Sequence, residues 1–152
     1  MRYLNWISVV SLAVMLFASV AAAQVPEHYS PGQTITISLK FRGPGADQIT
    51  IVSGRLIPTT PELKDQEGFQ RDIRVDGTKT GPNTFKLSFP IKDNSGSGTY
   101  HIDFINAGTG GESPLWVVYK PEQDYPDITF KVENRLRFSK PKIEDFTVIP
   151  KP

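Results

Sequence analysis

The chain has 152 residues, 22% of them charged, and contains no cysteine. Its 17 basic and 16 acidic residues give a formal net charge of +1, so no excess of positive charge is present to attract nucleic acid or anionic lipid. The lack of cysteine excludes disulfides, thiolate metal sites, cysteine nucleophiles and lipid attachment through a cysteine.

Residues 1–23 have the pattern of a secretory signal peptide. A single positive charge, Arg2, is followed by an apolar stretch over residues 7–17 and by small residues that end in Ala23. The apolar stretch is shorter than the ~20 residues that a membrane-spanning helix needs. We therefore expect cleavage before Gln24, export to the periplasm or the cell exterior, and no transmembrane segment in the mature chain. An uncleaved membrane anchor is the alternative.

Removal of this leader leaves 129 of the 152 residues, with 16 basic and 16 acidic side chains because Arg2 is lost. That length suits one domain with a substantial core. We expect the domain over residues 24–140. A proline-bounded tail or extra edge strand should follow over residues 141–152.

Alternating apolar residues predict two strands near the start of the domain. In Thr34–Phe41 every second side chain is apolar, which is typical of a half-buried strand. The next strand is expected over Ile49–Ile57, with Gly54 as a bulge or a point of close backbone approach.

The following segment is polar and punctuated by proline. We expect an exposed loop over residues 58–68, with one helical turn at 61–65 as an option, and then a weaker strand at Phe69–Val75. Residues 78–83 are interpreted as a connection. No long apolar pattern with helical spacing occurs, so helices should be nearly absent.

The most informative stretch is Thr84–Asn106. Apolar residues alternate in its first half, the turn formers of residues 93–98 interrupt it, and a second alternating strand follows. We expect Tyr100, Ile102 and Phe104 to share one face of this strand. A tyrosine that opens a strand directly after a glycine-rich corner predicts a tyrosine corner, in which the hydroxyl bonds to nearby backbone.

Two interpretations are open for the segment after Asn106. Leu115–Tyr119 is apolar on both faces, whereas Ile128–Val132 alternates. Either the first segment is the last strand of the sandwich and the second is an addition, or the second closes the sheet and the first is an inserted hairpin. The regular alternation of the second segment favours the latter arrangement.

Three short motifs resemble parts of one known superfamily. They are Pro31–Ile37, a Pro-Gly turn followed by alternating apolar residues, Ser97–Tyr100 at the expected corner, and Thr129–Asn134 as a closing strand. Over residues 31–134 this order resembles the immunoglobulin-like and fibronectin type III superfamily, especially the bacterial immunoglobulin-like (Ig-like) domains of exported proteins. The resemblance implies adhesion, spacing or ligand binding, and it carries over no catalytic residue.

We therefore expect an all-β fold, an antiparallel Ig-like β-sandwich of about seven to nine strands. The chain departs from antibody domains because it lacks the core cysteine pair. It also has no tryptophan in the strand expected at Ile49–Ile57.

His101 and Asp103 are the first candidates for chemistry. Residues two apart in a strand share a face at about 6–7 Å, so this pair could contribute to a metal site. Zinc, however, usually takes three or four protein ligands, and the chain has only one other histidine, His28. The oxygen-rich loop that begins at Asp93 has Phe104 at its twelfth position, where an EF-hand requires Glu. We therefore expect neither a metal nor another cofactor.

The patterns of nucleophilic catalysis are missing from the sequence as well. No serine has glycines two positions before and after it, and the glycine-rich residues 108–111 lack the Lys-Ser/Thr of a phosphate loop. We therefore expect a protein that is not an enzyme. A small hydrolase with unrecognised residues is kept as an alternative.

The aromatic residues Trp116, Tyr119 and Tyr125 form the candidate binding site. They lie in a stretch bounded by Gly and Pro, and one face of the apolar segment around Trp116 could be uncovered. Exposed aromatics serve both sugars and protein partners. Our leading hypothesis is an exported binding or adhesion module that acts through loops and an edge strand, and the alternative is a carbohydrate-binding domain. If the 141–152 tail covers Trp116, the loops are the remaining candidates.

Overall fold

The structure, a computed structural model, describes residues 28–144 and residue 147. The expected signal peptide, residues 1–23, and most of the expected tail lie outside the described residues. The elements in chain order are β1 (Thr34–Lys40), the short 3-10 helix η1 (Ala46–Gln48), β2 (Ile49–Pro58), β3 (Ile73–Asp76), β4 (Thr78–Gly81), β5 (Thr84–Pro90), β6 (Gly98–Thr109), β7 (Trp116–Tyr119) and β8 (Thr129–Val132). Among the residues that the structure describes, no helix has the length and apolar character needed to span a membrane.

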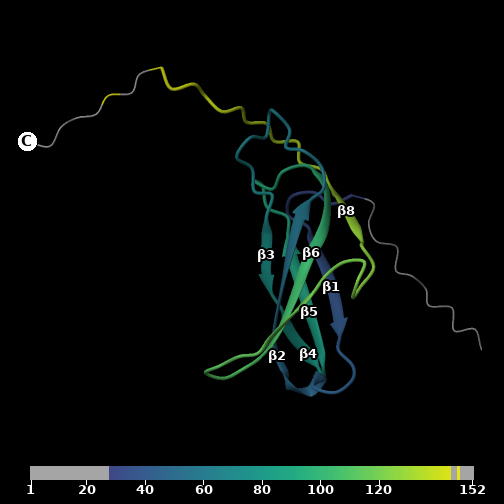
Figure 1. Cartoon of the computed structure of the whole chain (residues 1–152). Coiled ribbons are helices and arrows are strands. Elements are labelled where there is room, and N and C mark those ends of the chain that lie inside the picture. The colour runs from purple at the N-terminus through teal and green to yellow at the C-terminus, as the bar shows by residue number, and fades with distance from the viewer. Residues whose placement is uncertain (1–27, 145–146, 148–152) are drawn as a thin grey trace, which may run out of the picture.

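The strands form two antiparallel sheets. One sheet has the order β1-β5-β4, and the other has the order β3-β2-β6-β7, with β8 also paired to β6. Figure 1 shows the strands running along the length of the molecule, with the connections gathered at its two ends. The predicted all-β, antiparallel architecture of two sheets is therefore confirmed.

The core lies between the two sheets and follows the alternation of the strands. Phe85, Leu87 and Phe89 of β5 are fully buried, and they belong to one cluster with apolar residues of β2 and β6. The sheets approach each other closely at Gly54, where an added Cβ would fall 2.8 Å from Leu87 Cδ1 and 3.1 Å from Phe89 Cζ. The close approach predicted for Gly54 is thus confirmed, because any side chain there would displace the core of the opposite sheet.

The predicted tyrosine corner is also confirmed. The hydroxyl of Tyr100, which is fully buried, donates a hydrogen bond of 2.7 Å to the backbone carbonyl of Gly96. Burial raises the pKa of this hydroxyl, because the charged phenolate would lose its hydration.

A bulge in β6 corrects the expected face pattern. Arg55 of β2 lies opposite Phe104 and the next residue, Leu56, lies opposite Ile102, so no residue of β2 lies opposite Asp103 in the backbone register. The extra residue inverts the alternation: Ile102 faces the core, whereas Phe104 faces outward with Arg55 6.0 Å from its ring centroid. The prediction that Phe104 shares a face with Tyr100 is therefore wrong.

Three local expectations between β2 and β5 are also corrected. The expected strand at Phe69–Val75 is limited to β3, and the expected connection at residues 78–83 contains β4, which pairs with β5. The optional helical turn at 61–65 is not formed, since a hydrogen-bonded turn from Leu63 to Gln66 occupies this position. The loop is not uniformly exposed either, because Gln66 is fully buried.

The last edge of the larger sheet is a strand in two parts. β7 and β8 both pair antiparallel with the same edge of β6, β7 near its end and β8 near its start. Tyr119 lies opposite Ile105 and Thr129 lies opposite His101. The chain between them, residues 120–128, leaves the sheet and returns. Both interpretations of the sequence were therefore incomplete, because each apolar segment is part of the sheet.

Candidate functional site

The β7 edge, defined as residues 115–119, is the most exposed apolar segment of the larger sheet. Leu115 is 74% exposed, Trp116 50%, Val117 54% and Val118 52%. This segment follows a tip over residues 110–114 that is exposed throughout. Figure 1 shows the β6–β7 hairpin projecting away from the body of the sandwich. The projection explains why this segment is apolar on both faces and yet accessible.

Trp116 lies on the outer face of its sheet. Its partner across the strands is Gly108, whose neighbour Ala107 belongs to the core, so Gly108 and Trp116 face away from the core. A Cβ on Gly108 would lie 2.7 Å from Cε3 of Trp116. The glycine therefore creates the space in which the indole ring lies.

Tyr119 occupies the opposite face. It lies across from Ile105, and its ring centroid is 5.6 Å from that of Phe41, which packs against the core from the smaller sheet. The side chain of Tyr119 thus closes the edge of the sandwich.

Tyr125 lies in the 120–128 excursion and fills the break in the edge strand. Its hydroxyl donates a hydrogen bond of 3.2 Å to the carbonyl of Ile102, a part of β6 that neither β7 nor β8 covers. Burial, followed by the nearby carboxylates of Asp103, Asp127 and Asp124, raises the pKa of Tyr125 to about 12. Tyr119 and Tyr125 therefore line one pocket of about 350 Å³ together, whereas Trp116 stands apart from them on the exposed edge.

The two residues considered for a metal site are held in separate contacts. His101 Nδ1 lies 3.2 Å from Asp127 Oδ1 of the excursion, and Asp103 Oδ2 accepts a hydrogen bond of 3.2 Å from Arg55. In the described part of the chain, no group of three or more His, Cys, Asp or Glu side chains has a metal-binding arrangement. These contacts hold the excursion and the outer face of the sheet in place.

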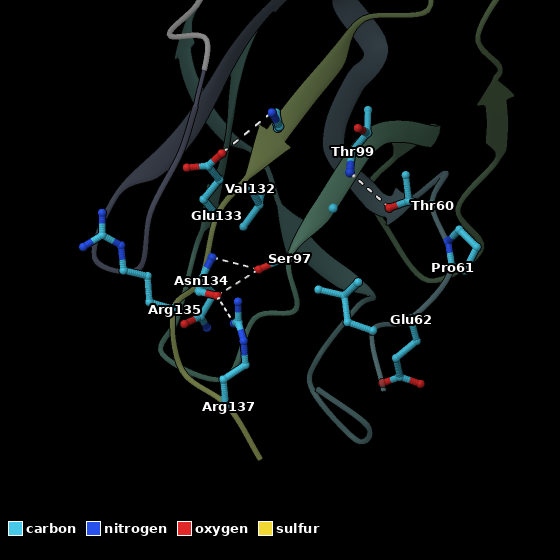
Figure 2. A pocket seen from close by; sticks show the side chains of 13 residues that line it. Thr60, Pro61, Glu62, Ser97, Thr99, Val132, Glu133, Asn134, Arg135 and Arg137 are labelled. Atoms are coloured by element: carbon cyan, nitrogen blue, oxygen red, sulfur yellow. Dashed lines mark hydrogen bonds and ion pairs between the residues drawn. The ribbon is translucent and has the colours of Figure 1, made fainter. Parts of the chain in front are cut away.

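A groove of about 630 Å³ lies at the other end of the sandwich, between the loop after β2 and the segment after β8. Figure 2 shows Thr60, Pro61 and Glu62 on one wall and Glu133, Asn134 and Arg137 on the other. Its charged side chains are mainly engaged: Arg137 pairs with Asp65, and Lys131 with Glu133. These two pairs contribute little electrostatic preference for a charged ligand.

Two buried amides beside this groove tie three loops together, and the sequence did not reveal them. Gln66 donates to the carbonyls of Asn134 and Leu136, both at 3.0 Å, and accepts from the amide of Ser97 at 2.7 Å. The side chain of Asn134 donates to the carbonyls of Asp93 and Ser95 and accepts from the amide of Leu136. Each polar group of both side chains has a partner. Since a single polar residue in a loop carries no periodic pattern, no signal in the sequence would have identified this network.

The tail does not reach Trp116 within the part that is described. Residues 139–144 are exposed. Figure 1 shows the chain leaving the sandwich at the end opposite the β6–β7 hairpin. Coverage of Trp116 by residues 141–144 is thereby excluded.

No protein-family model, no curated protein and no solved structure matches this chain. The geometry of the β7 edge is thus the feature that bears most directly on function.

Proposed function

We propose that this protein is an exported, non-enzymatic binding module of the Ig-like type, which takes an extended strand of a protein partner on the β7 edge. The observation that carries the proposal is an edge strand in which three successive apolar residues, Trp116, Val117 and Val118, are half or more exposed. Strand addition of this kind obtains affinity from backbone hydrogen bonds and specificity from alternate side chains.

The backbone of β7 is oriented for such pairing. The amide of Thr109 donates to the carbonyl of Leu115 at 3.1 Å, so Leu115 directs its backbone groups toward β6. Because these directions alternate along an antiparallel strand, Val117 and Tyr119 also face β6. The amides and carbonyls of Trp116 and Val118 therefore face the free edge.

The charges on the other edge strands make β7 stand out. β1 ends in Lys40, β3 contains Arg74 and Asp76, and β4 contains Lys79. Charged side chains on an edge oppose pairing with another chain. Of the edge strands in the described residues, β7 is the one without a charge.

The Ig-like assignment is supported by the strand order and by the corner at Tyr100. It is further supported by Tyr29, which pairs in parallel with Val132 on the last edge. Export is supported by the pattern of residues 1–23.

A carbohydrate ligand is the second candidate, and the half-exposed ring of Trp116 favours it. Sugars are commonly held by stacking on an aromatic face, and Trp116 offers one such face. The placement of Tyr119 and Tyr125 away from Trp116 makes this candidate the weaker of the two.

The experiment compares capture by matched variants. Protein purified after expression of the full chain is immobilised and exposed to the exported fraction of its native cells, and retained proteins are quantified by mass spectrometry. Val118→Lys places a charge on the β7 edge, and Thr80→Lys places the same charge on the exposed edge of β4 as the control. A segment of each retained protein is then tested as a synthetic peptide.

The proposal predicts a protein that is captured by the Thr80→Lys variant and not by the Val118→Lys variant. A peptide from that protein should compete with it for binding. Equal retention by both variants would contradict it. A glycan array probed with the wild type and Trp116→Ala tests the second candidate, which requires a sugar whose binding depends on Trp116.

A further inference from the structure

We infer that the strand received by the β7 edge is β7 of a second copy of this chain, paired antiparallel about a two-fold axis at Val117. This inference rests on the proposed function, because it needs β7 to accept a strand. It adds the identity of the partner and the register of the pairing.

The free backbone groups select this register. With the axis at Val117, Trp116 lies opposite Val118 of the second copy, so residues that face the free edge meet and each pair exchanges both hydrogen bonds. An axis at Trp116 would place Pro114, which has no N–H, opposite Val118 and leave the carbonyl of Val118 without a donor. The axis at Val117 satisfies all the outward amides and carbonyls of Trp116 and Val118.

The ends of the strand limit the pairing to this short segment. Pro114 precedes it, and Lys120 follows it with both backbone groups already engaged by Asp124: the amide donates to Oδ2 at 2.8 Å, and the carbonyl accepts from the amide of Asp124 at 3.0 Å. The sheet therefore gains one neighbouring strand and cannot extend the pairing further along the chain. A two-fold contact of this kind closes as a dimer instead of growing into a fibre.

The side chains on the outer face complement one another in this register. Trp116 and Val118 stand on the same face, and the ring of Trp116 lies back over Gly108 of its own β6. Each Trp116 then meets the smaller Val118 of the second copy, so the two indoles do not compete for the same space. The apolar surface that is exposed on β7 becomes covered by an equivalent apolar surface.

The charges favour an antiparallel second copy. Glu112 precedes the apolar segment and Lys120 follows it. Antiparallel pairing brings the end of β7 that carries Lys120 to the end of the second copy that carries Glu112, so that opposite charges meet at both ends of the contact. A parallel arrangement would instead place Lys120 beside Lys120 of the second copy and Glu112 beside Glu112, so that like charges meet.

The first test is the mass of the protein in solution. Sedimentation equilibrium of the purified protein over a wide concentration range should give a monomer–dimer equilibrium. Val118→Lys should weaken the dimer about 10-fold or more, since it places a charge in the pairing, whereas Thr80→Lys should leave it unchanged. Circular dichroism checks that both variants are folded.

The second test measures the register of the pairing between the two β7 strands. It does not depend on whether Val118→Lys is stably folded. The chain has no cysteine of its own. On the axis, Val117 faces Val117 of the second copy as a non-hydrogen-bonded pair with Cα atoms about 4.5 Å apart, which is within the range of a disulfide. Oxidation should therefore link Val117→Cys into a covalent dimer, whereas the control Thr80→Cys should stay monomeric.

The outcomes separate this inference from the proposed function. A wild type that stays monomeric at all concentrations, or Val117→Cys that links no faster than Thr80→Cys, overturns the second copy as partner. Capture of a different protein that depends on Val118 would then leave the proposed function standing. If neither a dimer nor capture of a partner that depends on Val118 is observed, both the inference and the proposed function are contradicted.

Discussion

The six-membered ring of Trp116 covers Gly108, its partner on β6: three ring atoms lie within 2.7–3.0 Å of the position that a Cβ would take. The indole can lie there because Gly108 has no side chain. The packing of Trp116 on Gly108 can be followed by tryptophan fluorescence, since the chain has only two tryptophans and the other, Trp6, belongs to the expected leader.

Gly108→Ala should displace the ring of Trp116 from the sheet. We expect a red shift of its fluorescence emission and faster quenching by iodide, because the displaced ring gains contact with water. The matched control is Gly81→Ala in β4, where an added Cβ meets only Thr84 at 3.9 Å or more, and it should leave the spectrum unchanged. An unaltered spectrum for Gly108→Ala would contradict the packing of Trp116 on Gly108.

Trp116→Ala should lower the free energy of unfolding by no more than about 1 kcal/mol, because half of the side chain is already exposed. Urea denaturation measures this change. A loss of about 3–5 kcal/mol, as for a buried aromatic, would place Trp116 in the core and end its assignment to a binding edge.

Tyr100→Phe should cost about 1–2 kcal/mol of stability, because the buried carbonyl of Gly96 loses its donor. The ring stays in place, so the midpoint of urea denaturation should fall without a change in its slope. Tyr119→Phe, at the margin of the sandwich, is the comparison and should have a smaller effect. An equal midpoint for Tyr100→Phe and the wild type would argue against the corner.

Gln66→Met should destabilise the fold by about 2–3 kcal/mol, since it leaves the buried carbonyl of Asn134 without this donor and the part-buried amide of Ser97 without its acceptor. Asn134→Ala removes the other side of the same network. Because the two residues act on shared loops, the double variant should lose less stability than the sum of the single ones. Strict additivity in a urea denaturation cycle would show that the two amides act independently.

Tyr125 should make the stability depend on pH in the alkaline range. Its pKa is about 12 in the folded protein and 10.0 ordinarily, so the folded state holds this proton more tightly. The contribution is fully present below pH 10 and is lost as the pH rises toward 12. Tyr125→Phe should therefore reduce the fall in stability measured by urea denaturation between these values, and an unchanged fall would contradict the raised pKa.

The exported protein should begin at Gln24. Intact mass spectrometry of the species recovered outside the cytoplasm should lack residues 1–23. Recovery of the full-length chain in the membrane fraction would instead indicate an uncleaved anchor.

The sequence predicted those strands whose inner faces are apolar and whose register is regular. In β5, Phe85 and Leu87 alternate with polar residues, and all the expected inner positions are buried. β4 escaped prediction because Thr78–Gly81 has no apolar side chain and joins the sheet through its backbone. The bulge at Asp103 was equally hidden, since the adjacent apolar residues Phe104 and Ile105 fit either face until the partner strand determines the register.

The candidate site could be predicted in part. Trp116 was identified because an apolar segment with two apolar faces cannot be buried on both by one sheet. The grouping of Trp116 with Tyr119 and Tyr125 depended on sequence proximity, and that proximity misleads here because β7 directs neighbouring side chains to opposite faces and the excursion carries Tyr125 back to β6.

The division of the last edge strand has a consequence for how the chain can evolve. β8 contributes Phe130 and Val132 to the core, and its outer edge is covered by Tyr29, so substitutions there are constrained by folding. β7 contributes few core contacts, and residues 120–128 separate it from β8. Substitutions in β7 are therefore less constrained by folding. Under the proposed function, selection can vary the composition of β7 and the choice of partner while the half of the edge that maintains the fold stays unaltered.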